Sequence, residues 1–252
     1  TLEEVRDILL AEVAKLRNGE FDEAVLNGTI NNMKLSLMRS LEDNGSRADM
    51  FVQSFINGTD WADDVKSIER MQEVTKEDIM NWAGRYLGEN SYAIVYKRMG
   101  EDKNVIKVTA PKITPIKSNR DKKSAFLEEI TSTEVKPIEP SFIDYSTALS
   151  QFDVDGLNVV YVQNEVNDLA ELYYEFFTGT QNDPALKLAA NYLSYLGTPT
   201  RSAEEIAQEM YQLACTSNLR SGSSSSFISI SGLSKNLPEA MRIVEGLIYN
   251  AV

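Results

Sequence analysis

A stretch rich in proline and lysine divides the sequence into two parts and limits how the chain can fold. Prolines recur between residues 111 and 140, and proline lacks the backbone N–H that a helix interior or a central strand needs. Lysine and arginine cluster in the same stretch of an otherwise acidic chain. We interpret it as a solvated linker, or else as an electrostatic tie between two acidic lobes. The predicted domains are residues 1–110 and 145–252, joined by a linker over residues 111–144.

Apolar residues in the first 88 positions recur at helical spacing, which predicts a run of helices. The first apolar stripe comprises Leu2, Val5, Leu9, Val13 and Leu16. Asn-Gly pairs that are expected to end helices lie at residues 18–19, 44–45 and 57–58. Asp22 is the expected N-cap of the second helix. A short fourth helix is expected over about residues 60–71, and Thr75 with Asp78 forms a capping box for the fifth.

The spacing changes after residue 88. Residues 92–96 and 105–109 are short runs rich in β-branched and aromatic side chains, and each predicts a strand. We therefore expect an α+β first domain that is mostly helical. Because the sequence begins and ends within helical patterns, we expect the chain to be an internal fragment of a longer protein. The earlier strands of the first domain would then lie upstream of Thr1.

The second part of the chain shows strand spacing first. Asp155-Gly156 lies between two β-rich runs and predicts a β-hairpin. Residues 168–177 predict a third strand and residues 185–196 a helix. Ser202 and Glu205 form a capping box before another helix, and a strand around Ile228 and a final helix follow. The order β-β-β-α-α-β-α is typical of an α+β roll with an antiparallel sheet.

Composition excludes several chemistries. The 252 residues include 25 basic and 38 acidic side chains, no histidine and one cysteine, and the formal charge is −13. Histidine-ligated zinc, a Ser-His-Asp triad, an intrachain disulfide and a cysteine-cluster metal site are therefore excluded from this chain. The acidic charge argues against nucleic acid as a partner. No apolar run is long enough to span a membrane, and the compartment stays open between the cytoplasm and the periplasm or cell envelope.

The side chains that remain for catalysis have simpler explanations. Asp63-Asp64 and Glu204-Glu205 lie at expected helix starts, where carboxylates favour the helix dipole. The serine run at residues 223–226 has no lysine in P-loop spacing and no base to activate it, so it predicts a loop before a strand. Cys215 follows an apolar helix and is expected to be a small core residue. No catalytic residue is assigned to this chain.

Two series of motifs resemble a known family. The first comprises residues 19–23 (Gly-Glu-Phe-Asp-Glu), 46–48 (Ser-Arg-Ala), 74–79 (Val-Thr-Lys-Glu-Asp-Ile) and 82–87, before the run at 92–96. The second comprises residues 155–162, 174–179, 190–198 and 201–206, which include Asp-Gly-Leu-Asn-Val-Val and Leu-Gly-Thr followed by Arg-Ser. In this order they are similar to the end of one half and the start of the next in the pitrilysin/insulinase (M16) family of zinc peptidases.

This resemblance implies a fold and a domain plan. It implies α/β-roll domains of the LuxS/MPP-like metallohydrolase fold, in which an antiparallel sheet packs with helices. Residues 1–110 would be the C-terminal part of the second domain of the first lobe. Residues 111–144 would link the lobes, and residues 145–252 would be the first domain of a second lobe.

The chain departs from the family at the zinc motif. The family's inverted His-x-x-Glu-His corresponds here to Asn191, Ser194 and Tyr195. Asparagine is a poor zinc ligand and serine is no general base. Residues 145–252 therefore resemble the degenerate half, and the zinc of the parent protein would be held outside this chain.

The resemblance implies a non-catalytic portion of a zinc-dependent metalloendopeptidase that hydrolyses peptides in a closed bilobed chamber. Its partners would be peptide substrates and the missing catalytic domain of the same polypeptide, and acidic walls would favour basic peptides. The first alternative is a family-like structural, assembly or peptide-binding protein with no active half. The second is an unrelated acidic α+β binding module.

Overall fold

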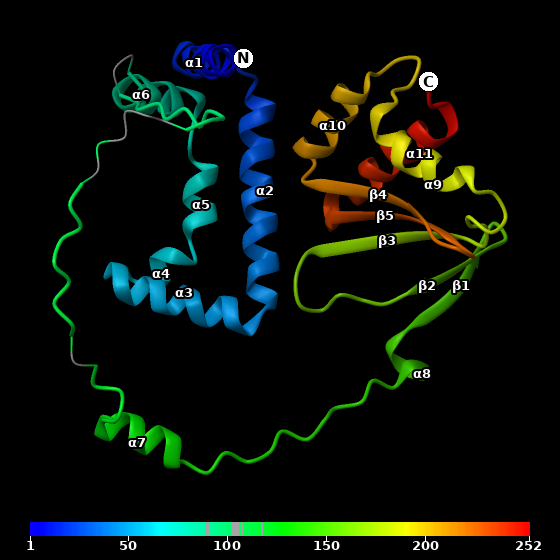
Figure 1. The fold of residues 1–252 in the computed structure, drawn as a ribbon. Helices are drawn as coiled ribbons and strands as arrows, with labels where there is room; N and C mark the ends of the chain where they lie inside the picture. Colours follow the sequence, from blue (N-terminus) through cyan, green and yellow to red (C-terminus); the bar gives the residue numbers. More distant parts are fainter. Residues whose placement is uncertain (89–90, 102–105, 107, 117) are drawn as a thin grey trace. The chain divides into compact units, whose positions relative to one another are not determined.

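The computed structural model describes residues 1–88, 91–101, 106, 108–116 and 118–252 of the chain. It contains two compact units. Unit 1 combines Thr1–Ile94 with Asn164–Val252, and unit 2 is Val95–Gln163. Helices and antiparallel sheets both occur in the described residues (Figure 1), which confirms the α+β class.

The first segment of unit 1 is helical, as predicted. Its helices are α1 (Leu2–Asn18), α2 (Glu23–Glu42), α3 (Asn44–Asn57), α4 (Trp61–Asp64), α5 (Ser67–Gln72) and α6 (Lys76–Tyr86). Gly19 and Gly58 end α1 and α3 in the left-handed conformation, with φ of 73° and 66°, which glycine adopts without a steric cost. Asp22 caps α2, and Thr75 and Asp78 form the predicted capping box of α6.

Two helix boundaries differ from the prediction. Asn44-Gly45 does not end the second helix, because Asp43 already ends α2 and its carboxylate accepts from the N–H of Ser46 at 2.7 Å as the N-cap of α3. An aspartate before an Asn-Gly pair can thus begin a helix at that pair. The single helix expected over residues 60–71 is two short ones, α4 and α5, separated at Val65 and Lys66.

The strand predicted at residues 92–96 is absent, since these described residues have no regular structure. A strand needs a neighbour to satisfy its backbone groups, and propensity alone does not supply one. The strand expected at residues 105–109 lies partly outside the described residues.

The second segment of unit 1 is a sheet with helices packed against it. The strands β3 (Leu169–Phe176), β5 (Ser226–Leu233) and β4 (Cys215–Ser221) lie in that order, and both pairings are antiparallel. The helices are α9 (Ala185–Tyr192), α10 (Ala203–Gln212) and α11 (Leu237–Asn250). The strand β4 was missed from sequence, because most of its residues are polar and it forms by pairing with β5.

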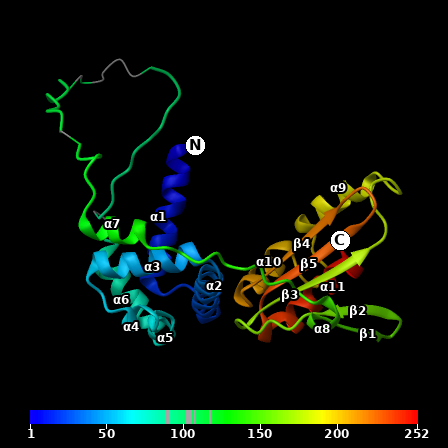
Figure 2. The same ribbon diagram turned by 90° about the horizontal axis from the view of Figure 1, so that it is seen from below.

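The core lies between the sheet and the helices α10 and α11 (Figures 1 and 2). It contains Ile206 and Met210 of α10, Ile228 and Ile230 of β5, and Ile243 of α11, all buried. Cys215 belongs to the same core with 3% of its surface exposed, which confirms its expected role as a small core residue.

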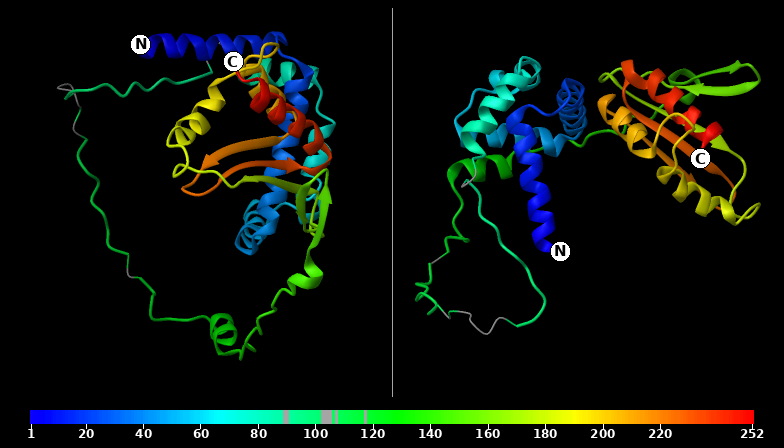
Figure 3. Two further views of the ribbon diagram at one scale, coloured as in Figure 1. Left: turned by 90° about the vertical axis from the view of Figure 1, so that its right-hand side faces the viewer. Right: turned by 90° about the horizontal axis from the view of Figure 1, so that it is seen from above.

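The helix α2 connects the two segments of unit 1. It packs against α10, and its residue Leu35 forms a second buried cluster with Ala214 and Leu233. These two partners lie where α10 passes into β4 and where β5 ends. Two further views show α2 against this end of the sheet segment (Figure 3).

Unit 2 contains the hairpin and the proline-rich stretch. The strands β1 (Ser150–Val154) and β2 (Leu157–Tyr161) pair as predicted, with Asp155 and Gly156 in the left-handed region at the turn. The helices α7 (Ala125–Ser132) and α8 (Tyr145–Ala148) precede the hairpin. The helix α7 was not predicted within this stretch, and it forms where the sequence has no proline, between Pro115 and Pro137.

Candidate functional site

The three residues expected at the positions of the zinc motif lie at the end of α9. Asn191 is in the helix, whereas Ser194 and Tyr195 belong to the 3₁₀ turn Leu193–Tyr195 that follows it. All three side chains are exposed, and Tyr195 is 77% exposed. The hydroxyl of Ser194 donates to the carbonyl of Asn191 at 3.4 Å, so it serves the local turn.

The chemistry of these three residues does not fit zinc. Zinc in proteins is held by imidazole, thiolate or carboxylate groups, and these positions offer an amide, a hydroxyl and a phenol. The backbone also tightens from α to 3₁₀ between Asn191 and Tyr195, so the two do not share the face of one continuous α-helix. Among the described residues, no group of three or more His, Cys, Asp or Glu could hold a metal ion.

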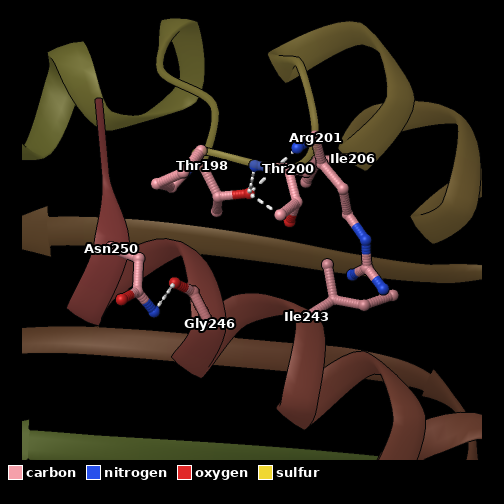
Figure 4. Close-up of a pocket in the computed structure, with 8 residues that line it drawn as sticks. Thr198, Thr200, Arg201, Ile206, Ile243, Gly246 and Asn250 are labelled. Atoms are coloured by element: carbon pink, nitrogen blue, oxygen red, sulfur yellow. Dashed lines mark hydrogen bonds between the residues drawn. The ribbon is translucent and has the colours of Figure 1, made fainter.

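The turn at residues 197–202 connects this helix to α10. Thr198 and Arg201 form an isolated antiparallel bridge, in which the N–H of Thr198 donates to the carbonyl of Arg201 at 2.7 Å. The hydroxyl of Thr198 accepts from the N–H of Arg201 at 3.1 Å (Figure 4). Gly197 is required here, because a Cβ on it would stand 2.4 Å from the carbonyl oxygen of Arg201.

The turn ends in the predicted capping box of α10. The Oγ of Ser202 accepts from the N–H of Glu205, and a carboxylate oxygen of Glu205 accepts from the N–H of Ser202 at 2.7 Å. The hydrogen bond from the backbone of Ser202 lowers the pKa of the Glu205 carboxyl, and the side chain of Ser202 adds to this effect. The motif therefore fixes the start of α10.

A hollow of about 260 Å³ lies beside this turn. Its lining is Thr198, Pro199, Thr200, Arg201, Ile206, Ile243, Gly246 and Asn250. In Figure 4 the side chain of Arg201 extends along the hollow towards Ile243. Arg201 forms an ion pair of 3.2 Å with Glu209, and the side-chain amide of Asn250 donates to the carbonyl of Gly246 at 3.0 Å. Both polar side chains are thus engaged with their own neighbours, and the lining holds no nucleophile with an adjacent base.

Other titratable groups in unit 1 have structural partners. The hydroxyl of Tyr174 on β3 donates to Glu245 of α11 at 2.6 Å, and burial raises the pKa of that tyrosine. Burial also raises the pKa of the Cys215 thiol, which makes it a poor nucleophile at neutral pH. Asp64 accepts from the hydroxyls of Ser54 and Thr59, and these bonds lower its pKa.

The serine run at residues 223–226 is part of a packed loop. A Cβ on Gly179 would stand 2.4 Å from the carbonyl oxygen of Ser223, so the loop and the segment after β3 lie in close contact. The N–H of Gln181 donates to the carbonyl of Ser223 at 3.0 Å, and the buried Ser226 donates to the carbonyl of Thr178 at 2.7 Å. Each of these contacts is structural.

Sequence reasoning missed the contact between α2 and α10. The signal lay in Gly28, Asn31 and Asn32, which are poor helix formers clustered within a long amphipathic helix. A glycine and two amides in such a place indicate a close approach of another element and carbonyl groups to be satisfied.

Comparison with known proteins finds a distant structural similarity and no matching sequence family. No protein-family model matches the chain, and no curated protein matches it. Among solved structures, it is similar to the periplasmic protease PqqL from Escherichia coli, with 12% sequence identity and a TM-score of 0.39 over 97% of this chain. The chain spans about 30% of the length of that protease. A TM-score of this size does not define a shared fold.

The structure holds no helix, among the described residues, that is long and apolar enough to cross a membrane.

Proposed function

We propose that the chain is a non-catalytic portion of a zinc-dependent metalloendopeptidase of the M16 type, which hydrolyses peptides in a closed bilobed chamber. The observation that carries the proposal is the segment from α9 to α10. There the Leu-Gly-Thr and Arg-Ser motif forms a tight turn and capping box, while the positions of the zinc motif, Asn191, Ser194 and Tyr195, have no zinc-binding chemistry.

In this proposal the chain contributes walls and no reacting groups. Residues 1–110 complete the second domain of the first lobe, residues 111–144 link the lobes, and residues 145–252 open the degenerate lobe. The zinc and its ligands belong to another domain of the same polypeptide. The formal charge of −13 favours basic peptides as the substrates that such walls attract.

A non-enzymatic role is the second candidate, as a structural, assembly or peptide-binding protein of the same ancestry. The observation that favours it is that no group of three or more His, Cys, Asp or Glu among the described residues could hold a metal ion. The two candidates differ in whether an active half is attached to this chain.

Two activity measurements test the proposal together. The purified chain should bind no stoichiometric zinc after dialysis, by elemental analysis, and should leave a library of quenched fluorescent peptides intact. The native protein, captured from its source cells with an antibody to this chain, should cleave the same library, and a zinc chelator should abolish that cleavage.

Each measurement has an outcome that contradicts the proposal. Chelator-sensitive cleavage by the purified chain would place the active site within it. A native protein that cleaves no member of the library would leave the non-enzymatic role as the better account.

A further inference from the structure

Unit 1 is built from two segments of chain that are far apart in the sequence. Thr1–Ile94 and Asn164–Val252 form one compact unit, and Val95–Gln163 is excluded from it. The contacts within unit 1 therefore do not need the intervening segment to be continuous. A cut in that segment would leave unit 1 as two chains held by non-covalent contacts.

The polar part of these contacts caps the end of α10. The amide of Asn32 donates to the carbonyl of Tyr211 at 2.7 Å, and the amide of Asn31 donates to the carbonyl of Gln212 at 3.4 Å. The last carbonyls of a helix have no partner within the helix, and α2 supplies donors to two of them. The carbonyl of Tyr211 also accepts from the N–H of Ala214 at 3.0 Å. Gly28 allows this approach, because a Cβ on it would stand 3.0 Å from the Cα of Gln212.

The apolar part lies one to two turns further along α2. Leu35, Ala214 and Leu233 are 5%, 0% and 2% exposed and form one buried cluster. Arg39 of α2 then donates to the hydroxyl of Ser231 on β5 at 3.3 Å. We call this whole contact, from Gly28 to Arg39 on α2 and from Tyr211 to Leu233 on its partner, the α2 seam.

The α2 seam has the character of an association surface. It combines a glycine-mediated close approach, buried apolar side chains and hydrogen bonds from α2 to the last two carbonyls of α10. Its two sides come from different segments, so it can hold them together after the peptide chain is cut.

An accessible cleavage site lies in the excluded segment. Lys122 and Lys123 are exposed and follow a turn in which the N–H of Lys122 donates to the carbonyl of Asn119 at 3.3 Å. Ser124, which comes next, is the N-cap of α7. Exposed loop segments of this kind are the preferred sites of proteolytic cleavage.

Two neighbouring basic residues are less suitable. Lys136 is followed by Pro137, whose ring and missing N–H hinder a protease at that bond. Arg120 is followed by Asp121, whose carboxylate opposes a protease that carries its own acidic recognition group.

We propose that the bonds after Lys122 and Lys123 are a processing site for an endopeptidase that recognises basic side chains, and that the two resulting chains stay joined through the α2 seam. The protease would bind the lysine in a pocket that carries a carboxylate. Water adds across the Lys123–Ser124 amide, for example, so that the C–N bond breaks and leaves a carboxylate on Lys123 and an amine on Ser124. This inference is independent of the proposed peptidase activity.

The first test is limited digestion of the full chain with trypsin under native conditions, followed by mass spectrometry and size-exclusion chromatography. The earliest cut should fall after Lys122 or Lys123, and the two products should elute together at the volume of the intact chain. An earliest cut at any other bond, or products that elute separately, would overturn the proposal.

Two sets of variants test the cleavage site and the α2 seam independently. The double substitution Lys122→Gln, Lys123→Gln should slow the first cut by at least about tenfold, because the carboxylate of the protease loses its charged partner. The matched control Lys112→Gln, Lys136→Gln should leave its rate unchanged. An unchanged rate in the first variant would place the site elsewhere.

Gly28→Leu tests the seam after the cut. Its products should separate on the column, whereas those of Gly84→Leu should stay together, since a Cβ on Gly84 meets no atom within 4 Å. If Gly28→Leu does not fold, the milder Asn32→Ala should raise the dissociation constant of the cut protein by about tenfold. Cut products of Asn32→Ala that bind as tightly as those of the unchanged chain would overturn the role of the seam.

Processing in the source cells is tested by sequencing the N-termini of the captured native protein. A terminus at Lys123 or Ser124, with both products in one native particle, is expected. Recovery of only uncut peptides across residues 119–127 would show that the accessible site is not used.

Discussion

Gly28 of α2 lies so close to Gln212 of α10 that a Cβ on the glycine would stand 3.0 Å from the Cα of the glutamine. Two segments separated by the whole of unit 2 meet at this point. The stability of unit 1 should therefore depend on the size of the residue at position 28 more than on its helix propensity.

The substitution Gly28→Ala tests that relationship against Gly84→Ala. Alanine in place of a helical glycine stabilises by about 0.5–1 kcal/mol through propensity, and Gly84 has room for the methyl group. At Gly28 the backbone of α10 must move, so the gain should be cancelled or reversed. The free energy of unfolding measured in urea should therefore be higher for Gly84→Ala than for Gly28→Ala. Equal gains would show that α2 and α10 do not approach as described.

Removal of the Asn32 amide should destabilise unit 1. Asn32→Ala deletes the hydrogen bonds to the carbonyls of Tyr211 and of Gly28, and should lower the free energy of unfolding by about 1 kcal/mol. Asn81 lies on the exposed face of α6, so Asn81→Ala serves as the control and should change stability by less than about 0.5 kcal/mol. A loss no greater than that of the control would argue against a capping role for Asn32.

The capping box of α10 should contribute measurably to the stability of unit 1. Ser202→Ala removes the acceptor for the N–H of Glu205 and should cost about 1 kcal/mol. Ser202→Asp keeps an acceptor at the N-cap and should restore most of that loss. Thermal unfolding of the three proteins measures both effects, and equal melting temperatures for Ser202→Ala and the unchanged chain would contradict the capping role.

Acid should weaken the capped helices. The hydroxyl and the N–H of Thr75 donate to the carboxylate of Asp78 at 2.6 and 2.9 Å, and these bonds lower its pKa. A carboxyl whose pKa is lower in the folded state stabilises above its unfolded pKa of about 4, and this contribution is lost as the pH falls through the folded value. Asp78→Asn keeps an acceptor that does not titrate.

The free energy of unfolding should accordingly fall less steeply between about pH 5 and pH 3 in Asp78→Asn than in the unchanged chain. Chemical denaturation at a series of pH values gives both slopes. Parallel slopes would show that the bonds to Asp78 contribute nothing that depends on pH.

Local signals in the sequence predicted much of the secondary structure. The glycines at residues 19 and 58, the caps of α2, α6 and α10, and the Asp155-Gly156 hairpin all occur where they were expected. Each is determined by residues a few positions apart, so a short stretch of sequence is enough to predict it.

Features that depend on distant partners were not predicted. The strand β4 has a mostly polar sequence and forms because β5 offers a complete antiparallel register. Residues 92–96 have strand propensity and form no strand. The α2 seam joins residues about 180 positions apart, and hydrogen bonds such as Asn32 to Tyr211 have no pattern within a short window.

The correspondence of the candidate site to a zinc motif stays a prediction, and its local geometry was not predicted. The resemblance predicts that Asn191, Ser194 and Tyr195 occupy the positions of the zinc motif, and the residue types alone show that their side chains are not those that bind zinc in proteins. The change to a 3₁₀ turn at Leu193 and the close packing of Gly197 against Arg201 could not be predicted, because both depend on how the chain packs in three dimensions.

The size of the native protein tests the central claim most directly. Cytoplasmic and envelope extracts from the source cells are each separated by size-exclusion chromatography. An antibody to residues 164–252 then identifies the fractions that contain the native protein. We predict a particle several times larger than the 28.2 kDa of this chain, with chelator-sensitive peptide cleavage in the same fractions. A particle of about 28.2 kDa without that activity would show that no catalytic half is attached and would contradict the account.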